Sequence, residues 1–155
     1  MAGRVEWVLL AYRIPREPST PRITVWRKLR RLGVVQVLDG LVALPADART
    51  REQLEWLADE VLEARGEATV WLGRLGSTAQ ERALAARMSE AIAAEYRQLI
   101  DDATSARTEP ASRRTLARLR RELRRVTQRD FFPPPERDEA RRAISALGEL
   151  VEVPL

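Results

Sequence analysis

The chain has 155 residues, is 45% hydrophobic and carries a formal net charge of +4. This size fits one domain with room for an appended subdomain. No apolar run reaches the ~18 residues of a membrane span, and the N-terminus lacks a secretory signal pattern, so we expect a cytoplasmic protein. It has no cysteine and no histidine, which excludes disulfides, thiolate chemistry and the commonest general base and metal ligand, so we expect no enzyme, metal or cofactor.

The first predicted elements are a strand over residues 5–14 and a helix that runs to about Leu32. Thr20 is expected to be the N-cap of this helix, with Pro21 at the first helical position and Gly33 ending it. Its apolar stripe consists of Val25, Trp26, Leu29 and Leu32.

Two short apolar runs, 34–38 and 41–45, flank the pair Asp39-Gly40. An Asp-Gly pair between apolar runs is a strong hairpin signal and predicts a type I′ turn.

Thr50 and Gln53 form a candidate capping box for a helix over 51–65 that buries Leu54, Leu57 and Val61. Gly66 is expected to cap its end, and 67–73 to be a fourth strand. The order β-α-β-β-α-β predicts an α+β, ferredoxin-like sheet domain over residues 1–75.

Residues 76–155 are predicted to be an all-α subdomain packed on the first part. Its expected helices cover 78–106, 111–128 and 136–150, with a break at 108–110. Their expected core positions are Leu84, Met88, Ile92, Tyr96, Leu99, Ala103, Leu116, Leu119, Leu123, Val126, Ala140, Ile144, Leu147 and Leu150.

Positive charge is concentrated in two segments. Residues 13–31 carry seven basic side chains against one glutamate, and 110–129 carry eight against one, so the remainder is acidic. Such a distribution indicates an oriented electrostatic field.

In the 111–128 helix, arginines recur at spacings of three and four and form one stripe opposite the leucines. These arginines are Arg114, Arg118, Arg121 and Arg125, continued by Arg129. The stripe is either a ridge that binds the phosphates of DNA or RNA, or a solvated or intramolecular face paired with carboxylates of the long preceding helix. The carboxylates expected for such pairing are Glu81, Glu90, Glu95, Asp101 and Asp102.

The first helix offers a second basic surface around Trp26, made of Arg22, Arg27, Lys28, Arg30 and Arg31. It could face nucleic acid, or it could be the solvated rim of a core tryptophan. Thr20 and Arg22 form a weaker candidate site for an oxyanion, because a helix start offers free N–H groups.

Other chemistry-bearing side chains are expected to be structural. Trp7, Trp56 and Trp71 are assigned to the core. Asp130 is expected to cap a helix or to pair with an arginine.

Three stretches together resemble the N-terminal domain of the chromate-resistance regulator ChrB family. They are WVLLAYRIPREPSTPRITVWRKLRRLGVV at 7–35, LPADARTREQLEWLADEV at 44–61 and RDFFPPPERDEARRAISAL at 129–147. The resemblance implies a cytosolic transcriptional regulator that binds operator DNA and responds to chromate.

Members of that family usually continue into a second, C-terminal domain, so the resemblance also implies that a sensor lies outside these residues. We therefore keep two interpretations. The chain is a DNA-binding regulator domain acting as a homodimer, or a non-catalytic interaction module working with a separate sensor chain. A more distant likeness to ferredoxin-like endonucleases fails at their metal-binding aspartate, because the first strand here ends in AYRIPRE.

Overall fold

The computed structural model describes residues 4–108 and 112–152. The chain folds into two compact units, residues 1–87 and 88–155, whose boundary lies within one long helix. The predicted break at 108–110 lies largely outside the described residues. The predicted α+β class is confirmed, because the described residues form a four-stranded antiparallel sheet and five helices.

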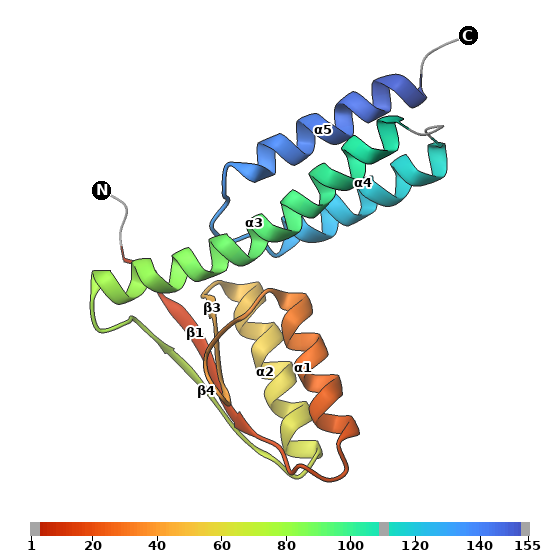
Figure 1. The fold of residues 1–155 in the computed structure, drawn as a ribbon. Coiled ribbons are helices and arrows are strands. Elements are labelled where there is room, and N and C mark those ends of the chain that lie inside the picture. The colour runs from red at the N-terminus through yellow and green to blue at the C-terminus, as the bar shows by residue number, and fades with distance from the viewer. Residues whose placement is uncertain (1–3, 109–111, 153–155) are drawn as a thin grey trace. The chain divides into compact units, whose positions relative to one another are not determined.

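The first unit is a sheet with two helices on one of its faces (Figure 1). In chain order its elements are β1 (Trp7–Arg13), α1 (Thr20–Leu32), β2 (Val35–Leu38), β3 (Leu41–Pro45), α2 (Ala48–Glu63) and β4 (Glu67–Gly73). The strands lie in the order β2-β3-β1-β4, and every neighbouring pair is antiparallel.

The core of this unit lies between the sheet and α1 and α2. In β1, Val8 and Leu10 pair with Leu44 and Val42 of β3, and all four side chains are fully buried. The helices contribute the buried Val25, Leu29, Leu54, Leu57 and Val61. Alternate positions of the paired strands therefore face the helices, as the period of two in a strand requires.

Both helix starts in this unit differ from the sequence prediction. The N-cap of α1 is Ser19, not Thr20, and its side chain makes no capping hydrogen bond. In α2 the capping box is formed by Asp47 and Thr50, because the Asp47 side chain accepts from Thr50 N–H and the Thr50 hydroxyl accepts from Asp47 N–H. Thr50 therefore occupies the third helical position, and the helix begins three residues earlier than predicted.

The hairpin is present, but its turn is not type I′. A type I′ turn needs positive φ at both central residues, whereas only Gly40 has it, at 77°. A register irregularity between Gln36 and Leu38 accompanies the turn. Gly40 is required here, since a Cβ at this position would lie 2.6 Å from the carbonyl oxygen of Tyr12.

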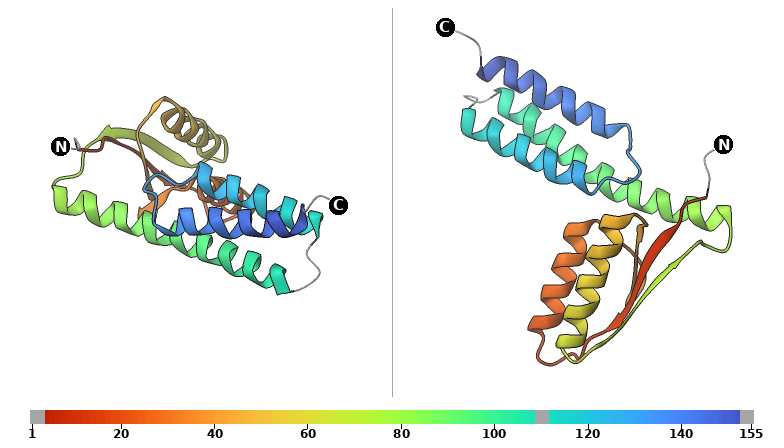
Figure 2. Two further views of the ribbon diagram at one scale, coloured as in Figure 1. Left: turned by 90° about the horizontal axis from the view of Figure 1, so that it is seen from above. Right: turned by 180° about the vertical axis from the view of Figure 1, so that it is seen from behind.

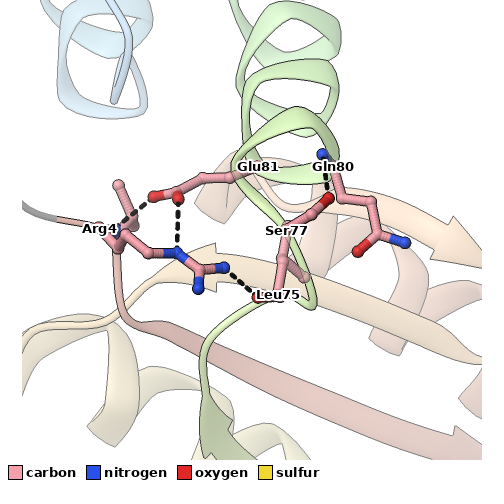
Figure 3. Close-up of polar contacts among 6 residues, drawn as sticks. Arg4, Leu75, Ser77, Gln80 and Glu81 are labelled. Carbon is pink, nitrogen blue, oxygen red and sulfur yellow. Dashed lines mark hydrogen bonds and ion pairs between the residues drawn. The ribbon is translucent and has the colours of Figure 1, made fainter.

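A buried glutamate ties the start of α3 (Thr78–Thr108) to the segment before β1 (Figure 3). Glu81 is only 8% exposed, accepts a hydrogen bond from Val5 N–H and pairs with Arg4. Arg4 also donates to the carbonyl of Leu75. The Ser77 hydroxyl accepts from Gln80 N–H at 3.1 Å and so satisfies one free donor of the first helical turn.

The second unit consists of the rest of α3 with α4 (Arg113–Gln128) and α5 (Glu136–Val151), which lie alongside one another (Figure 2). One apolar cluster joins the three, with fully buried Tyr96, Ala103, Leu119, Ala140 and Leu147 among its members. The predicted core positions are buried here with two exceptions. Leu123 is half-buried, and Leu150 is 51% exposed.

Candidate nucleic-acid and anion interface

The arginine stripe of α4 is on the surface. Arg114, Arg118, Arg121 and Arg125 are all exposed, whereas Leu116, Leu119 and Val126 on the other side of the helix are buried. From Arg114 to Arg125 the stripe extends about 16 Å along the helix axis, at a rise of about 1.5 Å per residue. We call these four residues the α4 ridge.

Most of the α4 ridge has no carboxylate partner. Arg125 pairs with Glu122 of the same helix at 2.7 Å. Among the described residues, no carboxylate lies within ion-pair distance of Arg114, Arg118 or Arg121. Three neighbouring guanidinium groups are therefore open to an external anion.

The predicted pairing of the stripe with the long helix is wrong except at its end, where Arg129 pairs with Glu95. Three of the other predicted carboxylates of α3 have different partners. Glu90 binds Arg97 in the same helix at 2.8 Å, Glu81 binds Arg4, and Asp102 accepts from Gln98. Arg120, on the flank of α4, pairs with Glu152 at 2.8 Å.

The basic residues of α1 differ in their surroundings. Lys28 forms an ion pair with Glu60 of α2 at 2.6 Å and so links the two helices. Arg22, Arg27, Arg30 and Arg31 are exposed, and Arg22 also lines a cavity at the start of the helix. Whether these residues bind nucleic acid stays a prediction. Trp26 is half-buried and lines the same cavity, so it is not simply a core residue.

The cavity lies at one end of the first unit and has a volume of about 1230 Å³. Its walls come from the end of β1, the segment leading into α1, the turn between β2 and β3, and the connection from α2 to β4. Four arginines line it, namely Arg13, Arg16, Arg22 and Arg65. The sequence does not predict this cavity, because it joins residues 12–26 to residues 36–40 and 65–67, which are distant in the chain.

Most of the positive charge in the cavity is not neutralised internally. Arg13 pairs with Glu67 at 2.6 Å. The side chains of Arg16, Arg22 and Arg65 have no hydrogen-bond or ion-pair partner within 4–108 and 112–152. The remaining carboxylate, Asp39, accepts from Gln36 at 3.3 Å.

Tyr12 lines the cavity between these charges. Burial raises the pKa of its hydroxyl, and Asp39 adds to this effect, while the positive charge of Arg22 opposes it. The phenol is therefore neutral at physiological pH and can donate a hydrogen bond.

The predicted oxyanion site at the start of α1 is only partly reproduced. Ser19 and Arg22 line the cavity, but Thr20 does not. Pro21 supplies no N–H group, which leaves this helix start with fewer donors than a typical anion site.

Two of the three tryptophans assigned to the core are on the surface. Trp7 is fully buried, as predicted, but Trp56 is 61% exposed and Trp71 is 59% exposed. Trp71 belongs to β4, which lies at an edge of the sheet.

No group of carboxylates able to hold a metal ion occurs among the described residues. None of the helices in the described part of the chain is long and apolar enough to cross a membrane.

Comparison with known proteins gives one family. The family described as "Protein ChrB, N-terminal" matches residues 22–111, which begin near the start of α1, include β2 through α3 and end before α4. Protein ChrB of Cupriavidus metallidurans is 27% identical over 133 residues, which is 82% of this chain and 40% of that relative. The chain thus spans less than half of the relative's length. No solved structure matches the chain.

Proposed function

The chain belongs to the family of ChrB N-terminal domains, and from this premise we propose that it is a non-catalytic, cytoplasmic DNA-binding domain of a chromate-resistance regulator. In this proposal the α4 ridge contacts the phosphate backbone of operator DNA. The single observation that carries it is the exposure of Arg114, Arg118 and Arg121 with no carboxylate partner in the described part of the chain.

The spacing of the α4 ridge suits a phosphate backbone. Phosphates recur about every 3.4 Å of helix axis along each strand of duplex DNA, so a ridge of about 16 Å can meet several of them. Repulsion between arginines at spacings of three and four disfavours the free helix by a few tenths of a kcal/mol per pair, and bound phosphate relieves it. Such contacts give affinity and orientation, while base contacts give sequence preference.

The strand arrangement of the first unit supports the fold class that we propose for it. The strand order β2-β3-β1-β4 with two helices on one face supports the ferredoxin-like class that we propose for residues 1–75.

Fluorescence anisotropy with a labelled duplex from the region upstream of the chain's own gene tests the proposal. We expect the triple variant Arg114→Ala, Arg118→Ala, Arg121→Ala to bind at least about tenfold more weakly than wild type. The control Arg49→Ala, Arg82→Ala, Arg142→Ala removes the same charge from exposed positions elsewhere and should bind as wild type does. Equal weakening by both triple variants contradicts a specific role for the ridge.

Release of the duplex by added chromate would place the chromate response in this chain, and retained binding would place it elsewhere.

A second candidate function is self-association through β4, and it rests on the exposure of Trp71 and Leu72. They are 59% and 43% exposed and lie on an edge strand, where unpaired backbone groups can accept another strand. In sedimentation velocity we expect a dimer that Trp71→Ser dissociates and Trp56→Ser, a change at an equally exposed tryptophan of α2, does not. A monomeric wild type at high micromolar concentration contradicts this function.

A further inference from the structure

The cavity of the first unit combines charge, size and an aromatic wall in a way that the proposed DNA contact does not use. Arg16, Arg22 and Arg65 supply positive charge and have no partner among residues 4–108 and 112–152, while Trp26 and Ile23 supply an apolar surface. The cavity and the α4 ridge share no residue.

Arg65 occupies a backbone position that normally belongs to glycine. It follows the end of α2 with a φ of 64°, and it is the residue with positive φ in a Schellman-type helix end. Its N–H bonds to the carbonyl of Leu62, and the N–H of Gly66 bonds to that of Val61. A side chain in this left-handed conformation is strained, so the fold alone favours glycine at position 65.

At the next position, Gly66, the fold requires glycine and the chain has it. A Cβ on Gly66 would lie 2.4 Å from the carbonyl oxygen of Arg13, so no other residue fits there. The chain thus has glycine at 66 and tolerates strain at 65, where the arginine lines the cavity. We take the strain as evidence that the guanidinium group itself is used.

The cavity is larger than a small anion needs, and part of its lining is apolar. Ligand pockets are commonly about 300–1,000 Å³, and the roughly 1230 Å³ here exceeds what a small tetrahedral anion fills. Such an anion could meet the arginines but would leave Trp26 and the other apolar lining unused. A ligand with a phosphate and a planar ring uses both, because arginines bind phosphate and tryptophan stacks on bases.

We propose that this cavity binds a nucleotide, with its phosphate on Arg16, Arg22 and Arg65 and its base against Trp26. The nucleotide is either free or the end of a single strand, since both present the same groups.

Isothermal titration calorimetry of the full chain tests the proposal with three probes: adenosine 5′-monophosphate, a 5′-phosphorylated single-stranded tetranucleotide and inorganic phosphate. We expect nucleotide binding by wild type that weakens at least about tenfold in Arg65→Gly and in Arg22→Ala, because each removes a charged phosphate contact. Arg49→Ala, which removes an exposed arginine at the far end of α2, should leave binding unchanged. Trp26→Leu should weaken the nucleotide but not inorganic phosphate.

Arg65→Gly distinguishes loss of a site from loss of the fold. Glycine relieves the strained conformation, so the Tm of this variant should be unchanged or higher by about 2–4 °C while binding is lost. Full binding by Arg65→Gly, or no binding of either nucleotide probe by wild type, overturns the proposal. Inorganic phosphate binding as tightly as the nucleotides overturns it too.

The probes also identify the source of the ligand. Equal affinity for the mononucleotide and the tetranucleotide indicates a free nucleotide, whereas preference for the tetranucleotide indicates the end of a strand. The α4 triple variant should keep nucleotide binding, and Arg65→Gly should keep duplex binding. Failure of this inference can therefore be told from failure of the proposed DNA contact.

Discussion

Tyr96 combines a buried ring with a hydrogen-bonded hydroxyl in the core of the second unit. Its ring is fully buried in the three-helix core, and its hydroxyl donates to Asp130 at 2.7 Å. Burial, and then the hydrogen bond to Asp130, raise the pKa of Tyr96 to about 12. The burial of Tyr96 could be predicted from the sequence, but Asp130 was expected to cap a helix or to pair with an arginine. Nothing in the sequence shows that these two side chains, 34 residues apart, form a hydrogen bond.

We expect Tyr96→Phe to change the alkaline stability of the protein. Because the folded protein holds the phenol neutral, the contribution of Tyr96 is fully present below its unfolded pKa of about 10 and is lost as the pH rises through about 12. Urea unfolding should show Tyr96→Phe less stable than wild type by about 1 kcal/mol at pH 8, with a difference that shrinks above pH ~10. A difference that stays constant up to pH ~12 contradicts this assignment.

Trp56 and Trp71 show where residue type misleads. Tryptophan is mostly buried in folded proteins, and this average places both in the core. Trp71 lies on an edge strand and pairs with Leu9. Its neighbours Val70 and Leu72 pair with Leu10 and Val8, whose side chains face the helices. Which strand forms the edge is fixed by the sheet order, and the sequence pattern does not contain that order.

At the scale of elements, the contact between the start of α3 and the segment before β1 depends on Glu81. We expect Glu81→Ala to destabilise the protein by about 1–3 kcal/mol, because it leaves the Val5 N–H and the Arg4 guanidinium without their acceptor. Glu90→Ala is the matched control, since Glu90 also pairs with an arginine but its side chain is 74% exposed. The control should cost less than about 1 kcal/mol. Chemical denaturation measures both, and equal losses contradict a special role for Glu81.

Helix boundaries were less predictable than helix existence. Two residues near the start of α2 are able to cap a helix, Asp47 and Thr50, spaced by three. Thr50 was the predicted cap, but in the structure it is the partner of Asp47 in the box. Its hydroxyl also donates to the carbonyl of Pro45 at 2.7 Å, a tertiary contact that local spacing does not reveal.

The α4 helix illustrates what periodicity can and cannot predict. The spacing of leucines and arginines correctly separates a buried side from an exposed side. Ion pairing depends on the exact approach of other helices. The expected partners on α3 were therefore wrong for the four residues of the ridge, and among the described residues of the stripe Arg129 alone pairs with α3, through Glu95. The absence of pairing among the described residues is what favours an external anion.

At the scale of the whole molecule, sites assembled from one helix could be predicted and a site assembled from several segments could not. The α4 ridge is visible in the sequence as a repeat. The cavity of the first unit combines Arg16 and Arg22, from the segment before α1 and the start of that helix, with Arg65, which follows α2, and the antiparallel sheet brings these parts to one end. Whether the helical part packs on the sheet part as predicted stays a prediction.

The central claim is that the α4 ridge neutralises DNA phosphates, and the salt dependence of binding tests it most directly. Each phosphate contact contributes about 0.9 to the slope of log affinity against log salt concentration. Affinity of wild type for the upstream duplex should fall steeply with salt, and the triple variant of Arg114, Arg118 and Arg121 should have a slope smaller by about 2–3. A slope that is the same in wild type and in this variant would show that these arginines do not touch the backbone and would contradict the account.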